Sequence, residues 1–215
     1  MAAGAGRPGR EARSPLRRGR QRRHRRRPAN RPARPTRGRG VFATVPIDVT
    51  DQDGIDRARD TILHSHPGLD TIVTMSGVMI PEDLRDPAHF SAAEKTIDTN
   101  LLGTIRVIDA FTPHLIGRGT GTIITVTSGI GFLPFPVMPT YAASKAGVHA
   151  YSEALRAQLD GTGIEVSELV PPAVATTPEQ AQHNPRALKL AEFATEVMDL
   201  LGPTPLRTRS SSRAC

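Results

Sequence analysis

Apolar and polar residues follow two different periods along residues 41–201. Apolar residues recur every three to four positions in four segments, a spacing that predicts amphipathic helices. The predicted helices span residues 51–64, 91–116, 141–159 and 188–201. Short runs rich in β-branched residues predict buried strands at residues 69–77, 121–128 and 163–170. Because strands and helices alternate, the pattern predicts an α/β fold with a doubly wound parallel sheet.

The ends of these elements carry local signals. An extended stretch begins at Val41 and ends near Asp48, and Ser91 with Glu94 three residues later fits a capping box at a helix start. Right-handed crossovers would bring the carboxyl ends of the strands to one edge of the sheet, where ligands bind in such folds. Four apolar loop residues would line the substrate side of that edge or would only pack the loop: Phe132, Leu133, Phe135 and Met138.

The two ends of the chain differ sharply from its centre. Residues 1–40 contain 15 Arg and one acid, Glu11, and residues 202–215 add three Arg, so the formal net charge of +7 leaves −10 on residues 41–201. Segments so basic and so poor in aliphatic residues are expected to be disordered. One interpretation is a basic arm that binds nucleic-acid phosphates, which the lack of aromatic residues for stacking makes the weaker one. The other interpretation is that the two terminal segments are translated in a wrong reading frame or from a wrong start, or derive from a damaged gene.

Cysteine content and hydropathy exclude several classes of protein. The single cysteine, Cys215, cannot form an internal disulfide, and no Cys/His cluster has the spacing of metal ligands. No apolar run approaches the roughly 18–20 residues that span a bilayer, and the basic N-terminus lacks the apolar segment of a secretory signal. We therefore expect a cytoplasmic protein with no metal and no membrane partner.

The candidate chemistry lies in the middle of the chain. Tyr141 and Lys145 are four residues apart on a predicted helix and share one face, where an ammonium would lower the pKa of a phenol and make it an acid or base. Ser128 ends the predicted strand 121–128, and its hydroxyl could polarise the same substrate oxygen. Asn100 lies inside a helix, where Asn is not favoured. Alone, Tyr-x-x-x-Lys is commonly a surface pair, and Ser128 could simply meet a backbone group.

Together, these motifs in this order resemble the classical short-chain dehydrogenase/reductase family over residues 41–201. The resemblance implies a Rossmann-like fold, with Tyr141 as the catalytic acid/base. Lys145 would lower the pKa of that phenol and bind the nicotinamide ribose, and Ser128 would orient the substrate carbonyl. Asn100 would hold a water that links Lys145 to solvent. The amino-acid sequence around Tyr141 resembles that of a bacterial subgroup of the family, which is named for teichoic-acid D-alanylation operons.

The same resemblance assigns further cofactor contacts, for NAD or NADP without a readable preference. Besides Tyr141 and Lys145 they are Asp48, Val49, Gly77, Pro171, Val174 and Thr176. Asp48 with Val49 would meet the adenine, although Asp48 could equally cap the next helix. Residues 171–176 match the family's Pro-Gly-x-Val-x-Thr turn, with Pro172 in place of Gly, and Gly77 ends a Thr-Met-Ser-Gly run where the family has Asn-Asn-Ala-Gly.

The family's glycine-rich phosphate loop is not readable in this sequence. The only candidate, Gly4-Ala-Gly6-Arg-Pro-Gly9, has no strand before it and no helix after it, and Pro8 interrupts it. We therefore predict a sheet that is incomplete at its N-terminal edge, in which the strand around Thr71–Thr74 lacks a neighbour.

These observations lead to three function classes. The first is an NAD(P)-dependent oxidoreductase that interconverts a small-molecule alcohol and a carbonyl, as a homodimer or homotetramer built on helices 91–116 and 141–159. The second is a catalytically dead member of the family or a truncated gene product. The third is the basic-arm nucleic-acid binder.

Overall fold

A computed structural model describes residues 43–201 of the chain, and the predictions for residues 1–40 and 202–215 lie outside them. The main helices are α1 (Gln52–Ser65), α2 (Phe90–Ile97), α3 (Gly103–Arg118), α4 (Pro139–Gln158), α5 (Pro178–His183) and α6 (Leu190–Leu200). The strands are β1 (Thr71–Thr74), β2 (Gly121–Val126), β3 (Ile164–Leu169), β4 (Val174–Ala175) and β5 (Leu188–Lys189). Short turns of 3-10 helix form η1 (Pro87–His89) and η3 (Gly129–Phe132), and η2 (Asp98–Leu102) is a π-helical turn.

The three longer strands form one parallel sheet in the order β1-β2-β3. Thr71 of β1 is in register with Thr122 of β2, and Gly121 of β2 with Ile164 of β3. Because all three strands run the same way, their carboxyl ends share one edge of the sheet. Among residues 43–201, β1 pairs with β2 alone, so its other edge has no strand neighbour in this part of the chain, as the sequence predicts.

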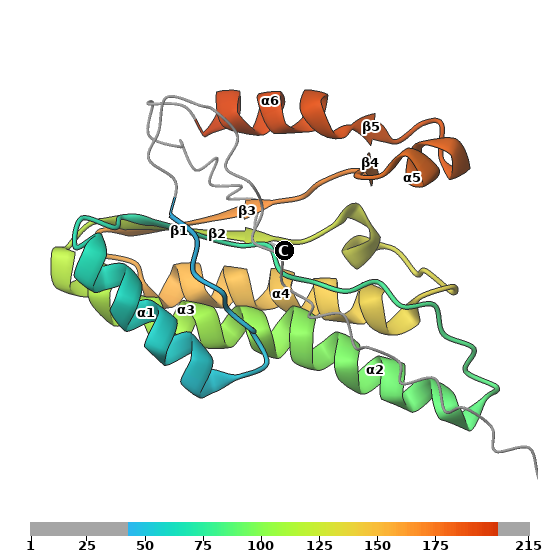
Figure 1. Ribbon diagram of the computed structural model, residues 1–215, viewed down its shortest axis with the longest axis horizontal. Coiled ribbons are helices and arrows are strands. Elements are labelled where there is room, and N and C mark those ends of the chain that lie inside the picture. Colours follow the sequence, from blue (N-terminus) through green and yellow to red (C-terminus); the bar gives the residue numbers. More distant parts are fainter. Residues whose placement is uncertain (1–42, 202–215) are drawn as a thin grey trace, which may run out of the picture. The chain divides into compact units, whose positions relative to one another are not determined.

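Helices α1, α3 and α4 lie on one side of this sheet (Figure 1), and α3 and α4 contact its strands directly. The core between helices and sheet is aliphatic except for one aromatic ring. Its members are Ile55, Ile72, Ile108, Ala110, Phe111, Leu115, Ile123, Leu155, Leu159, Ile164 and Val166. Burying one such aliphatic side chain stabilises a fold by about 1.5–3 kcal/mol, so this layer fixes the sheet against α4, the helix that carries Tyr141.

The predicted helix 91–116 is a composite of α2, η2 and α3, because the chain widens into one π-helical turn around Asn100. The predicted capping box at Ser91 is wrong. The chain is already helical at His89, so Ser91 lies inside the helix and its hydroxyl donates to the carbonyl of Ala88 at 3.1 Å. The entry is capped earlier, where the carboxylate of Asp86 accepts from the Ala88 N–H at 2.9 Å.

After β3 the chain forms a second, two-stranded parallel sheet from β4 and β5, which α6 contacts. The sequence pattern missed α5, whose six residues are too few to show a helical period. It also extended the last helix to residue 188, where the structure has β5. Between residues 43 and 201, none of the helices has the length and apolar character needed to cross a bilayer.

Candidate active site

Helix α4 carries the two residues at the centre of the site. Tyr141 and Lys145 lie in its first two turns and are 9% and 5% exposed. The Nζ of Lys145 donates to the carbonyl of Val126, the last residue of β2, at 2.8 Å. The same Nζ lies 5.9 Å from the centroid of the Tyr141 ring. The Tyr-x-x-x-Lys pair is therefore buried at the carboxyl end of the central strand and is not a surface pair.

Burial determines the protonation of this pair. It raises the pKa of the Tyr141 phenol above its ordinary value, and the Ser128 hydroxyl offsets part of this rise. Burial also lowers the pKa of the Lys145 ammonium. The sequence-based prediction of a lowered phenol pKa is therefore wrong for the chain alone, because desolvation outweighs the hydrogen bond with Ser128, and the Lys145 ammonium donates to Val126.

Ser128 follows β2 and is half-buried at the start of η3. Its Oγ accepts from the Ile130 N–H at 3.3 Å. The alternative role of Ser128, a hydroxyl at a strand end that bonds a backbone group, is therefore present as well. The N–H of the next residue, Gly129, donates to the carbonyl of Pro171 at 3.3 Å. This bond brings the turn that begins at Pro171 next to Ser128.

Asn100 is completely buried in the π-helical turn. Its Oδ1 accepts from the Val78 N–H at 2.7 Å, and its Nδ2 donates to the Val78 carbonyl at 3.0 Å and to the Ser144 Oγ at 3.1 Å. The carboxamide therefore ties the loop after β1 to helix α4. A water-holding role of Asn100 stays a prediction.

Gly77 lies against the same group of side chains. A Cβ at Gly77 would lie 3.2 Å from the Asn100 Oδ1 and 3.9 Å from the Lys145 Nζ. Gly77, Asn100 and Lys145 are thus neighbours in space, although 68 residues separate the first and the last of them in the sequence. A side chain at position 77 would occupy the space beside the Lys145 ammonium.

Asp48 and Val49 lie in the turn that leads into α1. The Asp48 carboxylate accepts from the Thr50 N–H at 2.9 Å and from its hydroxyl at 2.7 Å, and these bonds lower the pKa of Asp48. These bonds close a local turn. The alternative role for Asp48, a cap of the next helix, is wrong, because α1 begins at Gln52 and its N-cap position is Asp51. Val49 packs against Gly103 at the start of α3, and its carbonyl accepts from Arg106 at 3.2 Å. Adenine contacts by both residues stay predictions.

The remaining predicted cofactor residues lie in the turn between β3 and α5. Val174 pairs with Leu188 in the small sheet. Thr176 is exposed, and its N–H and its hydroxyl both donate to the Gln180 Oε1, at 2.8 and 2.7 Å. The Thr176 hydroxyl therefore has a partner within its own turn. Nicotinamide contacts by Pro171, Val174 and Thr176 stay predictions.

The apolar loop residues predicted for the substrate side lie at the end of η3 and in the loop from η3 to α4. Phe132 and Leu133 are 51% and 68% exposed. The Phe132 ring meets the His149 ring edge-on, with 4.8 Å between centroids. His149 in turn is hydrogen-bonded through Nδ1 to the Glu168 Oε2 at 2.8 Å, and the Thr127 hydroxyl donates to the other oxygen of Glu168. A polar network thus borders the loop at the ends of β2 and β3.

Sequence reasoning missed one buried acid near the site, Glu82. Its side chain is fully buried, and its two oxygens accept from the N–H and the hydroxyl of Thr140 at 3.0 and 2.7 Å. Thr140 immediately precedes Tyr141. An acid in a loop without periodicity carries no sequence signal of this kind, because its partner is 58 residues away.

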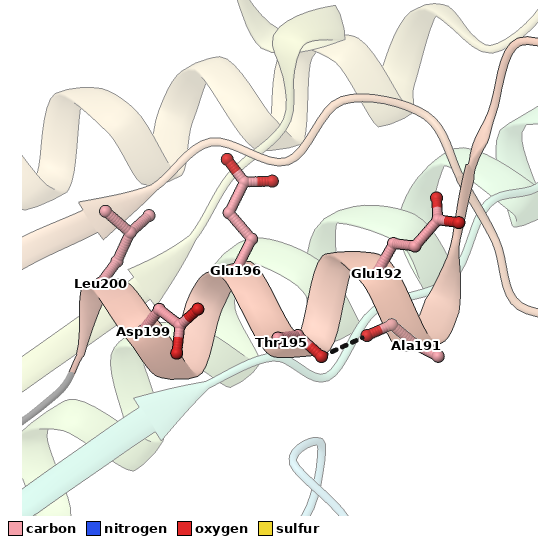
Figure 2. A pocket seen from close by; sticks show the side chains of 6 residues that line it. All are labelled: Ala191, Glu192, Thr195, Glu196, Asp199 and Leu200. Atoms are coloured by element: carbon pink, nitrogen blue, oxygen red, sulfur yellow. Dashed lines mark hydrogen bonds between the residues drawn. The ribbon is translucent and has the colours of Figure 1, made fainter.

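An open pocket on α6 is separate from these residues. Figure 2 shows its lining side chains: Ala191, Glu192, Thr195, Glu196, Asp199 and Leu200. The drawn hydrogen bond joins the Thr195 hydroxyl to the Ala191 carbonyl within the helix, at 2.9 Å. Three carboxylates would repel the phosphates of a dinucleotide, and none of the predicted site residues lines this pocket.

Comparison with known proteins identifies the family. The family model described as "short chain dehydrogenase" matches residues 22–187. The chain belongs to this family. The match begins inside the Arg-rich segment, earlier than residue 41, where the hydrophobic pattern begins.

Several proteins named as oxidoreductases or reductases are similar to the chain. "Uncharacterized oxidoreductase DltE" of Bacillus subtilis is 30% identical over 154 residues, which is 71% of this chain and 61% of that protein. "Dehydrogenase/reductase SDR family member 7B" of Danio rerio is 32% identical over 62% of this chain and 43% of its own length. "Sulfoacetaldehyde reductase" of Chromohalobacter salexigens is 34% identical over 62% and 53%. The chain thus spans about 60% or less of the length of these relatives.

Solved structures show the same fold. "ElxO with NADP Bound" superposes with a TM-score of 0.65 at 19% identity, covering 75% of this chain and 71% of that one. "Crystal structure of gox2181" gives a TM-score of 0.64 at 24% identity, covering 73% and 67%. These similarities show that the α/β, Rossmann-like arrangement predicted from the sequence is correct.

The nicotinamide end of a short-chain dehydrogenase cofactor fits the residues present. An ammonium has three donors, and Lys145 uses one of them on Val126, which leaves two for ribose hydroxyls. Gly77 leaves the space beside that ammonium open. The pyrophosphate end has no counterpart in the described part of the chain, because residues 43–201 contain no Gly-x-x-x-Gly-x-Gly sequence.

Proposed function

We propose that this chain is part of an NAD(P)-dependent oxidoreductase that interconverts an alcohol and a carbonyl, with Tyr141 as the acid/base. The observation that carries the proposal is the buried Tyr141–Lys145 pair on α4, which faces Ser128 at the carboxyl end of β2. The relatives support it, since DltE is named an oxidoreductase and the ElxO structure contains NADP. Their substrates do not transfer at these identities.

In this proposal Tyr141, Ser128 and Lys145 have different roles. With its pKa raised, Tyr141 holds its proton near neutral pH and can donate it to a carbonyl oxygen. Ser128 would donate a second hydrogen bond to that oxygen and orient it. Lys145 would hold the ribose through its two remaining donors and, once its charge is closer to the phenol, favour the phenolate of the reverse reaction. The nicotinamide, when bound, supplies or accepts the hydride.

The other contacts of NAD or NADP are part of the same proposal. Gly77 would allow close approach to the ribose, Asp48 and Val49 would meet the adenine, and Pro171, Val174 and Thr176 would meet the nicotinamide. Asn100 would act indirectly, by holding the loop that contains Gly77. A homodimer or homotetramer and a cytoplasmic location also remain predictions.

Substitution of the two tyrosines tests the proposal. A panel of small aldehydes and ketones is offered to the chain with NADPH or NADH, and nicotinamide absorbance is followed. Tyr141→Phe is expected to lower turnover by about 10²–10⁴-fold, because the proton donor is lost, while cofactor binding stays unchanged. Tyr151→Phe is the matched control and should keep its turnover.

Two results would argue against this assignment. Equal turnover of Tyr141→Phe and the unmodified chain would remove Tyr141 from the chemistry. Cofactor binding without turnover on any substrate would favour the catalytically dead family member.

A further inference from the structure

The start of helix α4 has an unusual cap. Met138 occupies the N-cap position with φ −145° and ψ 65°, and its side chain makes no capping hydrogen bond. Pro139 follows and has no N–H to satisfy. The first free N–H of the helix therefore belongs to Thr140, and a carboxylate from elsewhere in the chain accepts it.

That carboxylate is Glu82, which lies in the loop between β1 and η1. One of its oxygens accepts from the Thr140 N–H at 3.0 Å, and the other accepts from the Thr140 hydroxyl at 2.7 Å. The Glu82 N–H also donates to the Val137 carbonyl at 3.1 Å. A buried anion is stabilised at a helix N-terminus, where unpaired N–H groups and the helix dipole favour negative charge.

The loop that carries Glu82 is fixed at two points around the site. Asn100 holds Val78 through both backbone groups, directly after Gly77. Glu82 holds Thr140, directly before Tyr141. The three residues between these anchors thus connect the glycine beside Lys145 with the first turn of α4. We therefore expect a substitution of Glu82 to affect the position of Tyr141 more than the packing of the core.

We propose that Glu82 is a positioning residue for the Tyr141 hydroxyl, acting through both hydrogen bonds to Thr140. The inference extends the proposed function and rests on it for its catalytic meaning. In this proposal Glu82 acts indirectly, through Thr140. It keeps the first turn of α4 wound so that the phenol stays buried next to Ser128. His89 is the other polar neighbour, with its Nδ1 3.4 Å from the second oxygen of Glu82.

The test measures ionisation of the Tyr141 phenol without cofactor or substrate. The chain has two tyrosines and no tryptophan, so Tyr151→Phe leaves Tyr141 as the only phenol for near-ultraviolet titration. In this background we compare Glu82→Ala, Glu82→Gln and Asp83→Ala. Asp83 is the matched control, because it is the neighbouring acid, is exposed, and pairs only with Arg85 among the described residues.

We expect Glu82→Ala to move the Tyr141 pKa down toward its ordinary value, since an unwound first turn hydrates the phenol. At the pH where half of Tyr141 is ionised in the parent chain, we expect the ratio of ionised to neutral phenol to be roughly twofold higher in Glu82→Ala. Titration resolves a pKa shift of this size easily. Glu82→Gln should restore the original titration, because its amide can accept from the Thr140 N–H and donate to the hydroxyl. Thr140→Val, which loses only the hydroxyl bond, should shift in the same direction as Glu82→Ala and serves where that variant does not fold.

A lowered unfolding midpoint with a Tyr141 titration identical to that of Asp83→Ala would make Glu82 merely structural and overturn the inference. So would a Glu82→Gln chain that titrates like Glu82→Ala. Either failure leaves the turnover test of Tyr141→Phe untouched, and a failed turnover test leaves this titration interpretable.

Discussion

The protonation of Tyr141 is set by opposing local effects. Burial favours the neutral phenol, and the Ser128 hydroxyl favours the phenolate. Lys145 donates one of its hydrogen bonds to the Val126 carbonyl, and burial lowers the pKa of its ammonium. In the chain alone, Tyr141 therefore holds its proton more tightly than a free phenol, which is the form that the proposed carbonyl reduction would require.

Removing the Ser128 hydroxyl should raise the Tyr141 pKa further, because the effect that favours the phenolate is lost while burial remains. Near-ultraviolet titration of Ser128→Ala in the Tyr151→Phe background measures the change. Ser91→Ala is the control, since within residues 43–201 that hydroxyl bonds only the Ala88 carbonyl, in the adjoining turn η1. An unchanged or lowered Tyr141 pKa in Ser128→Ala would separate Ser128 from the phenol.

Tyr151 gives the folded chain a pH dependence in the alkaline range. Burial and the nearby Asp109 charge, which accepts from its hydroxyl at 3.2 Å, raise its pKa from the ordinary 10.0 to about 12. An unfolded chain loses this proton first, so the stability that Tyr151 contributes is fully present below pH 10 and is lost as the pH rises to about 12.

Tyr151→Phe should therefore show a shallower fall of Tm between pH 10 and pH 12 than the unmodified chain. The two chains share every other titratable group, so the effects of those groups cancel in the difference. Thermal unfolding followed by circular dichroism across this range checks the prediction. Parallel curves for the two chains would contradict it.

At the level of secondary structure, helix α3 begins where another segment crosses it closely. A Cβ at Gly103 would lie 2.7 Å from the Val49 Cγ2, 2.9 Å from its Cβ and 3.2 Å from its carbonyl oxygen. Only glycine fits at this contact without a shift of the segment that also contains Asp48. The approach holds the turn before α1 against the start of α3, directly after the π-helical turn that contains Asn100.

Gly103→Ala should destabilise the fold by about 1–3 kcal/mol, because the added methyl group overpacks this contact. Gly117→Ala in the same helix is the matched control. Nothing lies within 4 Å of its Cβ position, so it should stabilise the fold by about 0.4–1 kcal/mol through the unfolded state. Denaturant unfolding gives both free energies, and equal values for the two variants would refute the close contact.

The sequence predicted the helices and strands well where their apolar period is long. It placed α1, α4 and the three main strands, and it kept Tyr141 and Lys145 on one face of α4. It could not predict the π-helical turn at Asn100, because that turn is stabilised by bonds to Val78 and Ser144, the latter 44 residues away. It also misplaced the cap of α2. The carboxylate of Asp86 caps the turn η1, so the chain is already helical before it reaches Ser91.

Across the whole chain, the candidate site combines predicted and unpredicted parts. Composition and spacing pointed to Ser128, Tyr141 and Lys145, which lie close together at the carboxyl ends of the strands. The pKa direction of Tyr141 and the role of Glu82 depend on burial and on contacts between distant segments, which no local pattern encodes. The residues that would bind the cofactor's pyrophosphate are not readable from the sequence, and residues 1–42 lie outside the described part of the chain.

The most direct test of the account is a titration of the chain with NADPH and NADH, followed by nicotinamide fluorescence, which no tryptophan disturbs. A nicotinamide site at Tyr141 and Lys145 predicts saturable binding of at least one cofactor. Lys145→Met should weaken that binding by about tenfold or more, because hydrogen bonds from a charged donor contribute about 1.5–3 kcal/mol. Lys189→Met, at a lysine side chain that is 81% exposed, should bind like the unmodified chain. No saturable binding of either cofactor, or equal binding by the Lys145→Met chain, would contradict a nicotinamide site at Tyr141 and Lys145.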